Sequence, residues 1–106
     1  MLWRAKIGGT EVVVATNEGP DGSCVGVRVD VLNARIGTPG VAIFQCFAQA
    51  ISEGLERGVP LAAYVKTLSS RRFEPNGPVE GDPLVGECRS LVDYLVRAMA
   101  ARHGGA

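Results

Sequence analysis

The strongest constraint on the fold is that every strand-like segment of this sequence precedes every helix-like segment. Residues 2–7 and 10–16 are rich in apolar side chains, and Gly8-Gly9 joins them. Two glycines accept the positive φ angles of a two-residue loop, so these segments are expected to pair as a β-hairpin. After a turn-rich segment, valines alternate with glycine or polar residues over 25–31, which is typical of a strand with one buried face. The sequence therefore predicts about three N-terminal strands in a small antiparallel sheet.

Helical spacing of apolar residues begins after the third predicted strand. Thr38 is expected to supply an N-cap hydroxyl, with Pro39 at the first helical position. The apolar positions that follow leave little polar face before Gly58, so this helix is expected to be central. A second, short helix is expected to begin at Pro60.

A third helix is predicted to begin at Asp82, with Pro83 at its first position and an apolar stripe that continues to Met99. The fold class is therefore expected to be α+β, a small antiparallel sheet of about three N-terminal strands packed against about three helices. A chain of 106 residues can bury one core without a metal or a disulfide. Residues 1–106 are expected to form a single stand-alone domain.

Charge and hydrophobicity narrow the classes of partner. Eleven basic and eleven acidic residues give no net charge, which argues against the electrostatic binding of nucleic acids. No apolar run approaches the roughly 20 residues of a membrane helix, so a cytoplasmic protein without membrane contact is expected. The chain is 46% hydrophobic, and the consecutive residues Val12, Val13 and Val14 give one strand two apolar faces. A homo-oligomer is expected for this reason.

The three cysteines, Cys24, Cys46 and Cys88, lie far apart in the sequence, and His103 is the one histidine. This set is poor for zinc and poor for disulfides, so neither a metal nor another cofactor is expected. Cys46 and Cys88 fall on apolar helix faces and are expected to be buried. Cys24, in the loop "PDGSC", is the weak candidate for a reactive thiol, and His103 is expected in a frayed tail.

The segment "RRFEPNG" permits a structural and a functional interpretation. In the structural one, Arg71 and Arg72 offset the helix dipole at the end of the second helix. The phenylalanine would anchor the following turn in the core, Arg72 would pair with the glutamate, and the proline and glycine would set the backbone. The turn residues concerned are Phe73, Glu74, Pro75 and Gly77.

In the functional interpretation, the two guanidinium groups form an anion site. Arg71 and Arg72 would lie near the helix start at Gly37 and Thr38, where free backbone amides could help to bind a phosphate or carboxylate. Two charged residues on the polar face of the third strand could belong to the same site: Arg28 and Asp30.

A longer run of linked motifs resembles a known family. The run "GTPGVAIFQCFAQAISEGLERGVPLAAYVKTLSSRRFEPNG", followed by "GDPLVGECRSLVDY", is similar to the TSCPD domain, the C-terminal accessory domain of adenosylcobalamin-dependent (class II) ribonucleotide reductases. The similarity comprises a Gly-Thr helix start, a "GVPL" helix restart, an Arg-Phe-Glu-Pro-x-Gly turn and a "DP…S…DY" helix in this order. The preceding strands, ending in "VGVRVDVL", fit the sheet of that family.

The resemblance implies an accessory role beside nucleotide-reducing machinery. The radical chemistry of the reductase belongs to a large barrel that 106 residues cannot hold, and the ending "ARHGGA" lacks the Cys-x-x-C pair of the reductase tail. We therefore expect a non-catalytic accessory or regulatory protein that binds a ribonucleotide reductase, another protein or a second copy of itself. One alternative is a domain that binds a small anionic ligand such as a nucleotide or phosphate. The other is a thiol-dependent redox protein that uses Cys24.

Overall fold

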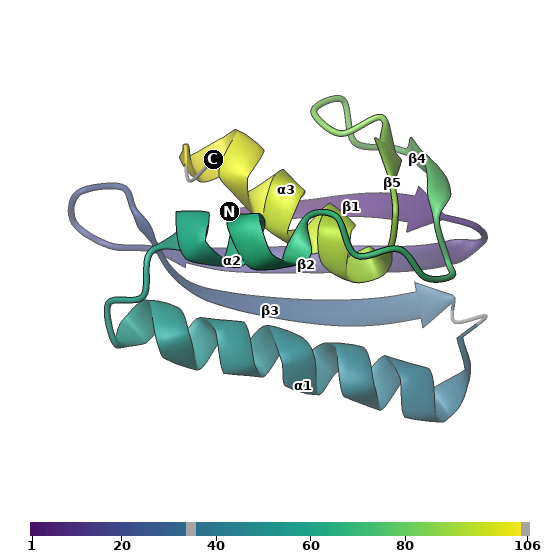
Figure 1. Ribbon diagram of the computed structural model, residues 1–106, viewed down its shortest axis with the longest axis horizontal. Helices are drawn as coiled ribbons and strands as arrows, with labels where there is room; N and C mark the ends of the chain where they lie inside the picture. The colour runs from purple at the N-terminus through teal and green to yellow at the C-terminus, as the bar shows by residue number, and fades with distance from the viewer. Residues whose placement is uncertain (34–35, 105–106) are drawn as a thin grey trace.

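The protein, described by a computed structural model over residues 1–33 and 36–104, combines one antiparallel sheet with three helices (Figure 1). The sheet order is β3-β2-β1-β4-β5. This confirms the α+β class and the antiparallel sheet, to which two short strands are added. In chain order the elements are β1 (Leu2–Ile7), β2 (Thr10–Glu18), β3 (Cys24–Asn33), α1 (Gly37–Glu56), α2 (Leu61–Leu68), β4 (Gly77–Glu80), β5 (Glu87–Cys88) and α3 (Leu91–His103).

The predicted hairpin is present between β1 and β2. Ile7 pairs with Thr10, and the loop residues Gly8 and Gly9 have φ angles of 57° and 82°. Both values lie in the left-handed region, where a side chain would be strained. The glycine pair therefore fixes the register that aligns the first two strands.

The two faces of the sheet differ in burial. Val12 and Val14 are fully buried in the core, whereas Val13 points to the opposite face and is half-buried. The neighbouring strand β3 places Arg28 and Asp30 on that opposite face, where both are exposed. Alternate residues of a strand point to opposite faces, so two of the three consecutive valines pack in the core and one lies on the opposite face.

The central helix is α3, not α1 as the sequence predicts. In Figure 1, α3 crosses in front of the strands while α1 runs alongside β3. Nine of the thirteen α3 residues are buried, whereas four of the twenty α1 residues are buried. The apolar arc of α1 is thus wider than the surface that covers it.

No helix among the described residues has the length and apolar character needed to cross a membrane.

The predicted starts of two helices are wrong. The helix expected from Asp82 begins at Leu91, because Ser90 is the N-cap and its Oγ accepts the N–H of Asp93 at 3.0 Å. Residues 82–90 instead form a turn followed by the short strand β5. In the turn, Oδ1 of Asp82 accepts the N–H of Leu84 at 2.9 Å. At α1, the N-cap is Ile36 and no side chain caps the helix, so the role expected for Thr38 is not observed.

A buried polar network joins β1, the turn after β4 and α3. Trp3 Nε1 donates to Tyr94 Oη at 3.0 Å, and Tyr94 Oη donates to Asp82 Oδ2 at 2.6 Å. Arg102 Nη2 donates to Asp82 Oδ1 at 3.0 Å, and its guanidinium lies 4.0 Å from the centre of the Trp3 ring. Burial alone would raise the pKa of Asp82, but the bonds from Arg102, Tyr94 and the Leu84 N–H lower it below its ordinary value. The carboxylate is therefore charged and fully partnered.

The substitution Tyr94→Phe tests how much this network contributes to the free energy of unfolding. Removing the hydroxyl leaves a buried carboxylate oxygen and the Trp3 N–H without their partner, which should lower the free energy of unfolding by roughly 1–3 kcal/mol. Urea titration at neutral pH measures the change. Tyr64→Phe is the matched control, because no hydrogen bond joins the Tyr64 hydroxyl to a described residue, and equal effects of the two substitutions would contradict the assignment.

Candidate functional site

The paired arginines follow the end of α2 and are both exposed. The Arg71 N–H donates to the carbonyl of Leu68 at 3.3 Å, which continues the turn at the end of the helix. Phe73 N–H donates to the carbonyl of Arg89 at 3.1 Å and fastens the loop to the segment between β5 and α3. Arg72 and Glu74 form no ion pair with each other, so the charged pair expected in this turn is not observed.

The turn residues lie elsewhere than predicted. Phe73 is 48% exposed and is therefore not the expected core anchor. Glu74 and Pro75 lie beside the first turn of α1, where they line a pocket with Ile36 and Gly40. Gly77 has a φ angle of 110°, which suits glycine at the start of β4.

The predicted anion site is not assembled as the sequence suggested. Glu74, not a guanidinium group, lines the two pockets at the first turn of α1, and the lining of these two pockets includes neither Arg71 nor Arg72. Arg28 and Asp30 line a different pocket of about 530 Å³ between β3 and the polar side of α1. Arg72 instead shares a small polar pocket with Arg89 and Arg97, two residues that the sequence did not single out.

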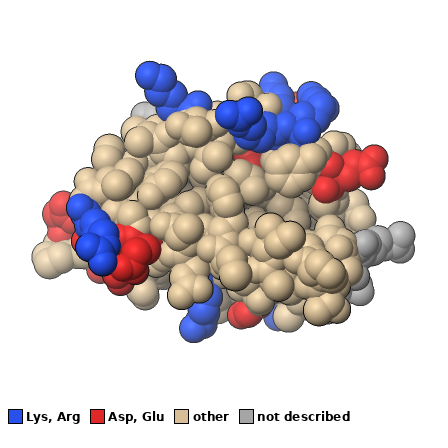
Figure 2. Space-filling view, turned by 60° about the horizontal axis from the view of Figure 1, so that its bottom comes forward, with Lys and Arg blue, Asp and Glu red and all other residues tan. Residues whose placement is uncertain are grey.

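An apolar groove of about 360 Å³ runs between α1, the end of α2 and the start of α3. Ile43, on the α1 side, is 69% exposed, and the ring of Phe73 lies on the opposite side. No charged residue occurs between Gly37 and Ser52 in α1. The space-filling view toward α1 shows charged side chains at the edges of an uncharged face (Figure 2). The groove is lined by Ile36, Gly40, Ile43, Phe44, Phe47, Leu68, Phe73, Glu74, Pro75, Leu91 and Val92.

We call this surface, the groove together with the exposed residues Ala42, Ile43, Cys46 and Ala50 of α1, the α1 face. Solvent-exposed apolar surface of this kind on a helix favours contact with another polypeptide. The sequence did not reveal this surface, because the same apolar residues were expected to lie in the core. The sequence signal for this surface was the width of the apolar arc of α1, which exceeds the width that the edge of one sheet can cover.

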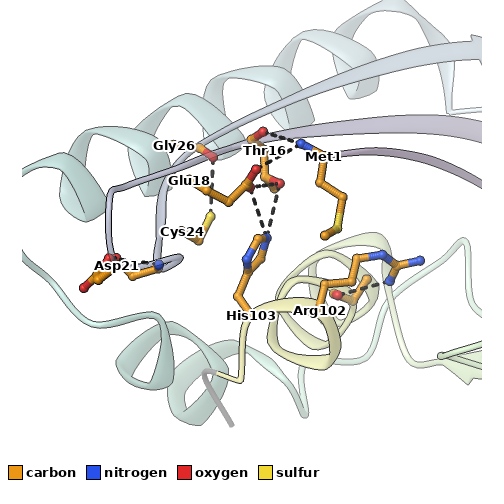
Figure 3. Close-up of polar contacts among 10 residues, drawn as sticks. Met1, Thr16, Glu18, Asp21, Cys24, Gly26, Arg102 and His103 are labelled. Carbon is orange, nitrogen blue, oxygen red and sulfur yellow. Dashed lines mark hydrogen bonds and ion pairs between the residues drawn. The ribbon is translucent and has the colours of Figure 1, made fainter.

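A polar cluster surrounds Cys24 and His103 at the other end of the sheet (Figure 3). Glu18 accepts hydrogen bonds from Thr16 Oγ1 at 2.7 Å and from the N-terminal ammonium group at 3.2 Å. Its Oε2 lies 3.5 Å from Nε2 of His103, whose side chain is only 3% exposed. The hydrogen bond from Thr16 is the main cause of the lowered pKa of Glu18. His103 thus fastens the end of α3 to β2 and does not lie in a frayed tail.

The Cys24 thiol is buried, contrary to the expectation from the loop sequence. It is 8% exposed and donates to the carbonyl of Gly26 at 3.4 Å, not to His103. Burial raises the pKa of Cys24, and the nearby Glu18 raises it further. Burial, with a contribution from Asp93, also raises the pKa of Cys88 to about 11. Since the thiolate is the nucleophile, this environment does not activate Cys24.

Thiol labelling tests the solvent exposure of the cysteines, which for Cys24 and Cys46 is the opposite of what the sequence predicts. Cys46 is exposed, whereas Cys24 and Cys88 are buried with raised pKa values, so at about pH 8 Cys46 should react with a thiol reagent far faster than the other two. Mass spectrometry of peptides locates the label over time. Cys46→Ser should remove the fast phase without changing the slow one, and fast labelling of Cys24 in that variant would show that the thiol is accessible.

Comparison with known proteins gives a family match and several curated relatives. Residues 2–103 match the model of the TSCPD domain. The chain is 35% identical over 102 residues, 96% of its length, to the vitamin B12-dependent ribonucleotide reductase of Agrobacterium fabrum, of which it covers 8%. It is 35% identical over 94 residues to the corresponding reductase of Streptomyces coelicolor, with 89% of this chain and 9% of that protein covered.

A third relative, the vitamin B12-dependent ribonucleotide reductase of Bradyrhizobium diazoefficiens, is 35% identical over 100 residues. The aligned region is 94% of this chain and 8% of that reductase, so the chain spans a small fraction of the relatives it matches. No solved structure matches it significantly. Because the family model extends over nearly the whole length and the sequence predicted the same resemblance, the chain belongs to the TSCPD domain family.

Proposed function

We propose that this protein is a non-catalytic accessory or regulatory module that acts by binding a ribonucleotide reductase of the vitamin B12-dependent type. The observation that carries the proposal is the match of residues 2–103 to the TSCPD family, together with 35% identity to one region of such reductases. In those relatives the matching region is part of a much longer chain. A domain of this family can therefore exist in contact with the rest of a reductase.

The α1 face is the surface that we assign to this contact. It combines an exposed apolar side chain, Ile43, with a groove lined almost entirely by apolar residues, and the helix residues 37–52 carry no charge. Burial of an apolar surface is the main favourable term in protein association, and charged residues are depleted at the centre of interfaces. The matching region in the relatives is continuous with a long polypeptide that can supply the other side.

A thiol-dependent redox function is less well supported. The raised pKa values of Cys24 and Cys88 keep both groups protonated near neutral pH. Cys46 is exposed, but α1 places no histidine and no second cysteine beside it. Binding of a small anionic ligand is the second candidate function, and the pocket shared by Arg72, Arg89 and Arg97 favours it.

Binding in trans tests the main proposal. The Agrobacterium fabrum reductase is prepared without the region that this chain matches, and its complex with the chain is measured by light scattering and interferometry. Ile43→Glu should weaken the complex at least about tenfold, or 1.4 kcal/mol, because it places a charge in an apolar contact. Ribonucleotide reduction by the shortened enzyme, with and without the chain, then shows whether binding affects turnover.

Gln49→Glu is the matched control, since Gln49 is exposed on the polar side of the same helix and gains the same charge. This control should bind as the unchanged chain does. If no complex forms and the chain alone is a dimer that Ile43→Glu dissociates, the α1 face binds a second copy. If neither a complex nor a dimer forms, the face has no protein partner of either kind and the proposal is wrong.

A further inference from the structure

The polar pocket beside Arg72 brings together three arginines from separate segments. Arg72 comes from the loop after α2, Arg89 from the link between β5 and α3, and Arg97 from the second turn of α3. The pocket has a volume of about 240 Å³. Its lining consists of Arg72, Asn76, Gly77, Glu87, Cys88, Arg89 and Arg97.

Arg97 is held in position by the protein. Its Nη1 donates to Asp93 Oδ2 at 3.0 Å and to the carbonyl of Glu87 at 2.9 Å. The Asp93 side chain is completely buried, and the same Oδ2 accepts the backbone N–H of Arg89 at 2.8 Å. Both bonds of Arg97 use Nη1, so its Nε and Nη2 donors are available to another acceptor.

Arg72 and Arg89 differ from Arg97 because their guanidinium groups make no hydrogen bond or ion pair with a described residue. The two segments are nevertheless joined, since Phe73 N–H donates to the Arg89 carbonyl at 3.1 Å. The charge of Arg97 is offset by Asp93, and one further carboxylate, Glu87, lies in the lining. Three guanidinium groups against these two carboxylates leave an excess of positive charge around a small polar pocket.

We propose that this pocket binds the phosphate group of a small phosphorylated ligand. Guanidinium groups bind phosphate oxygens through paired, charge-assisted hydrogen bonds, and three of them can surround one tetrahedral group. The pocket accommodates a phosphate or diphosphate, and the exposed positions of Arg72 and Arg89 leave room for the rest of the ligand outside. That this ligand is a nucleotide rests on the proposed function, whereas the phosphate site itself does not.

Calorimetric titration of the chain with inorganic phosphate, pyrophosphate, ADP and ATP tests the site. Arg72→Gln and Arg89→Gln should each weaken binding of the phosphorylated probes about 10-fold to 100-fold, because each removes a charge-assisted pair of bonds. Arg71→Gln is the matched control. Arg71 is the adjacent residue, equally charged and exposed, but does not line the pocket, so its replacement should leave the affinity unchanged.

The outcomes separate this inference from the proposed function. Equal weakening by Arg71→Gln and Arg72→Gln would show general attraction of anions by a basic surface and would overturn the site. Absence of binding by every probe at millimolar concentration would also overturn it. Binding of pyrophosphate without preference for nucleotides would support the site but not the nucleotide. Since the isolated chain is titrated, none of these results depends on whether a reductase binds the α1 face.

Discussion

The buried carboxylate of Asp82 is the constraint on which the arrangement of the other elements depends. A charged group in the core is costly unless every oxygen is hydrogen-bonded. Here both side-chain donors come from α3, Tyr94 in its first turn and Arg102 in its last, and Trp3 of β1 joins the network by donating to Tyr94. These bonds join both ends of α3 to Asp82 and, through Tyr94 and Trp3, to β1. The strongly apolar residues of α3 then fill the centre of the core.

The position of α3 determines which surface of α1 is left open. Since α3 covers the middle of the sheet, α1 is confined to the side of β3 and buries only Phe44, Ala48, Ile51 and Leu55. Ile43 is 69% exposed, and Ala42, Cys46 and Ala50 of the same helix are also exposed. The α1 face is therefore a consequence of the core arrangement and not of an unusual loop or a cavity.

Local patterns predicted the parts of the fold that depend on neighbouring residues. The Gly8-Gly9 loop, the alternating valines and the presence of helices at α1 and α2 could each be recognised from a short stretch of sequence. The start of α3 was not, because Asp82 before a proline resembles an N-cap, whereas the actual cap uses Ser90 and Asp93. The strands β4 and β5 have four and two residues, which is too short for periodicity to indicate them. The central position of α3 depends on hydrogen bonds between residues far apart in the sequence, and no short stretch of sequence contains both partners.

Short stretches of sequence could not reveal the candidate sites either, because the residues beside Arg72 and Phe73 come from distant segments of the chain. The loop 72–76 contributes to two surfaces: Arg72 and Asn76 line the arginine pocket, while Phe73, Glu74 and Pro75 line the apolar groove. A ligand that holds Arg72 also restrains the backbone that presents Phe73 to the groove. If the pocket binds a phosphorylated ligand and the groove binds a protein, the two affinities must therefore be coupled to the extent that both depend on the conformation of this loop. Thermodynamic linkage then requires the protein to change the affinity for the ligand by the same factor as the ligand changes the affinity for the protein.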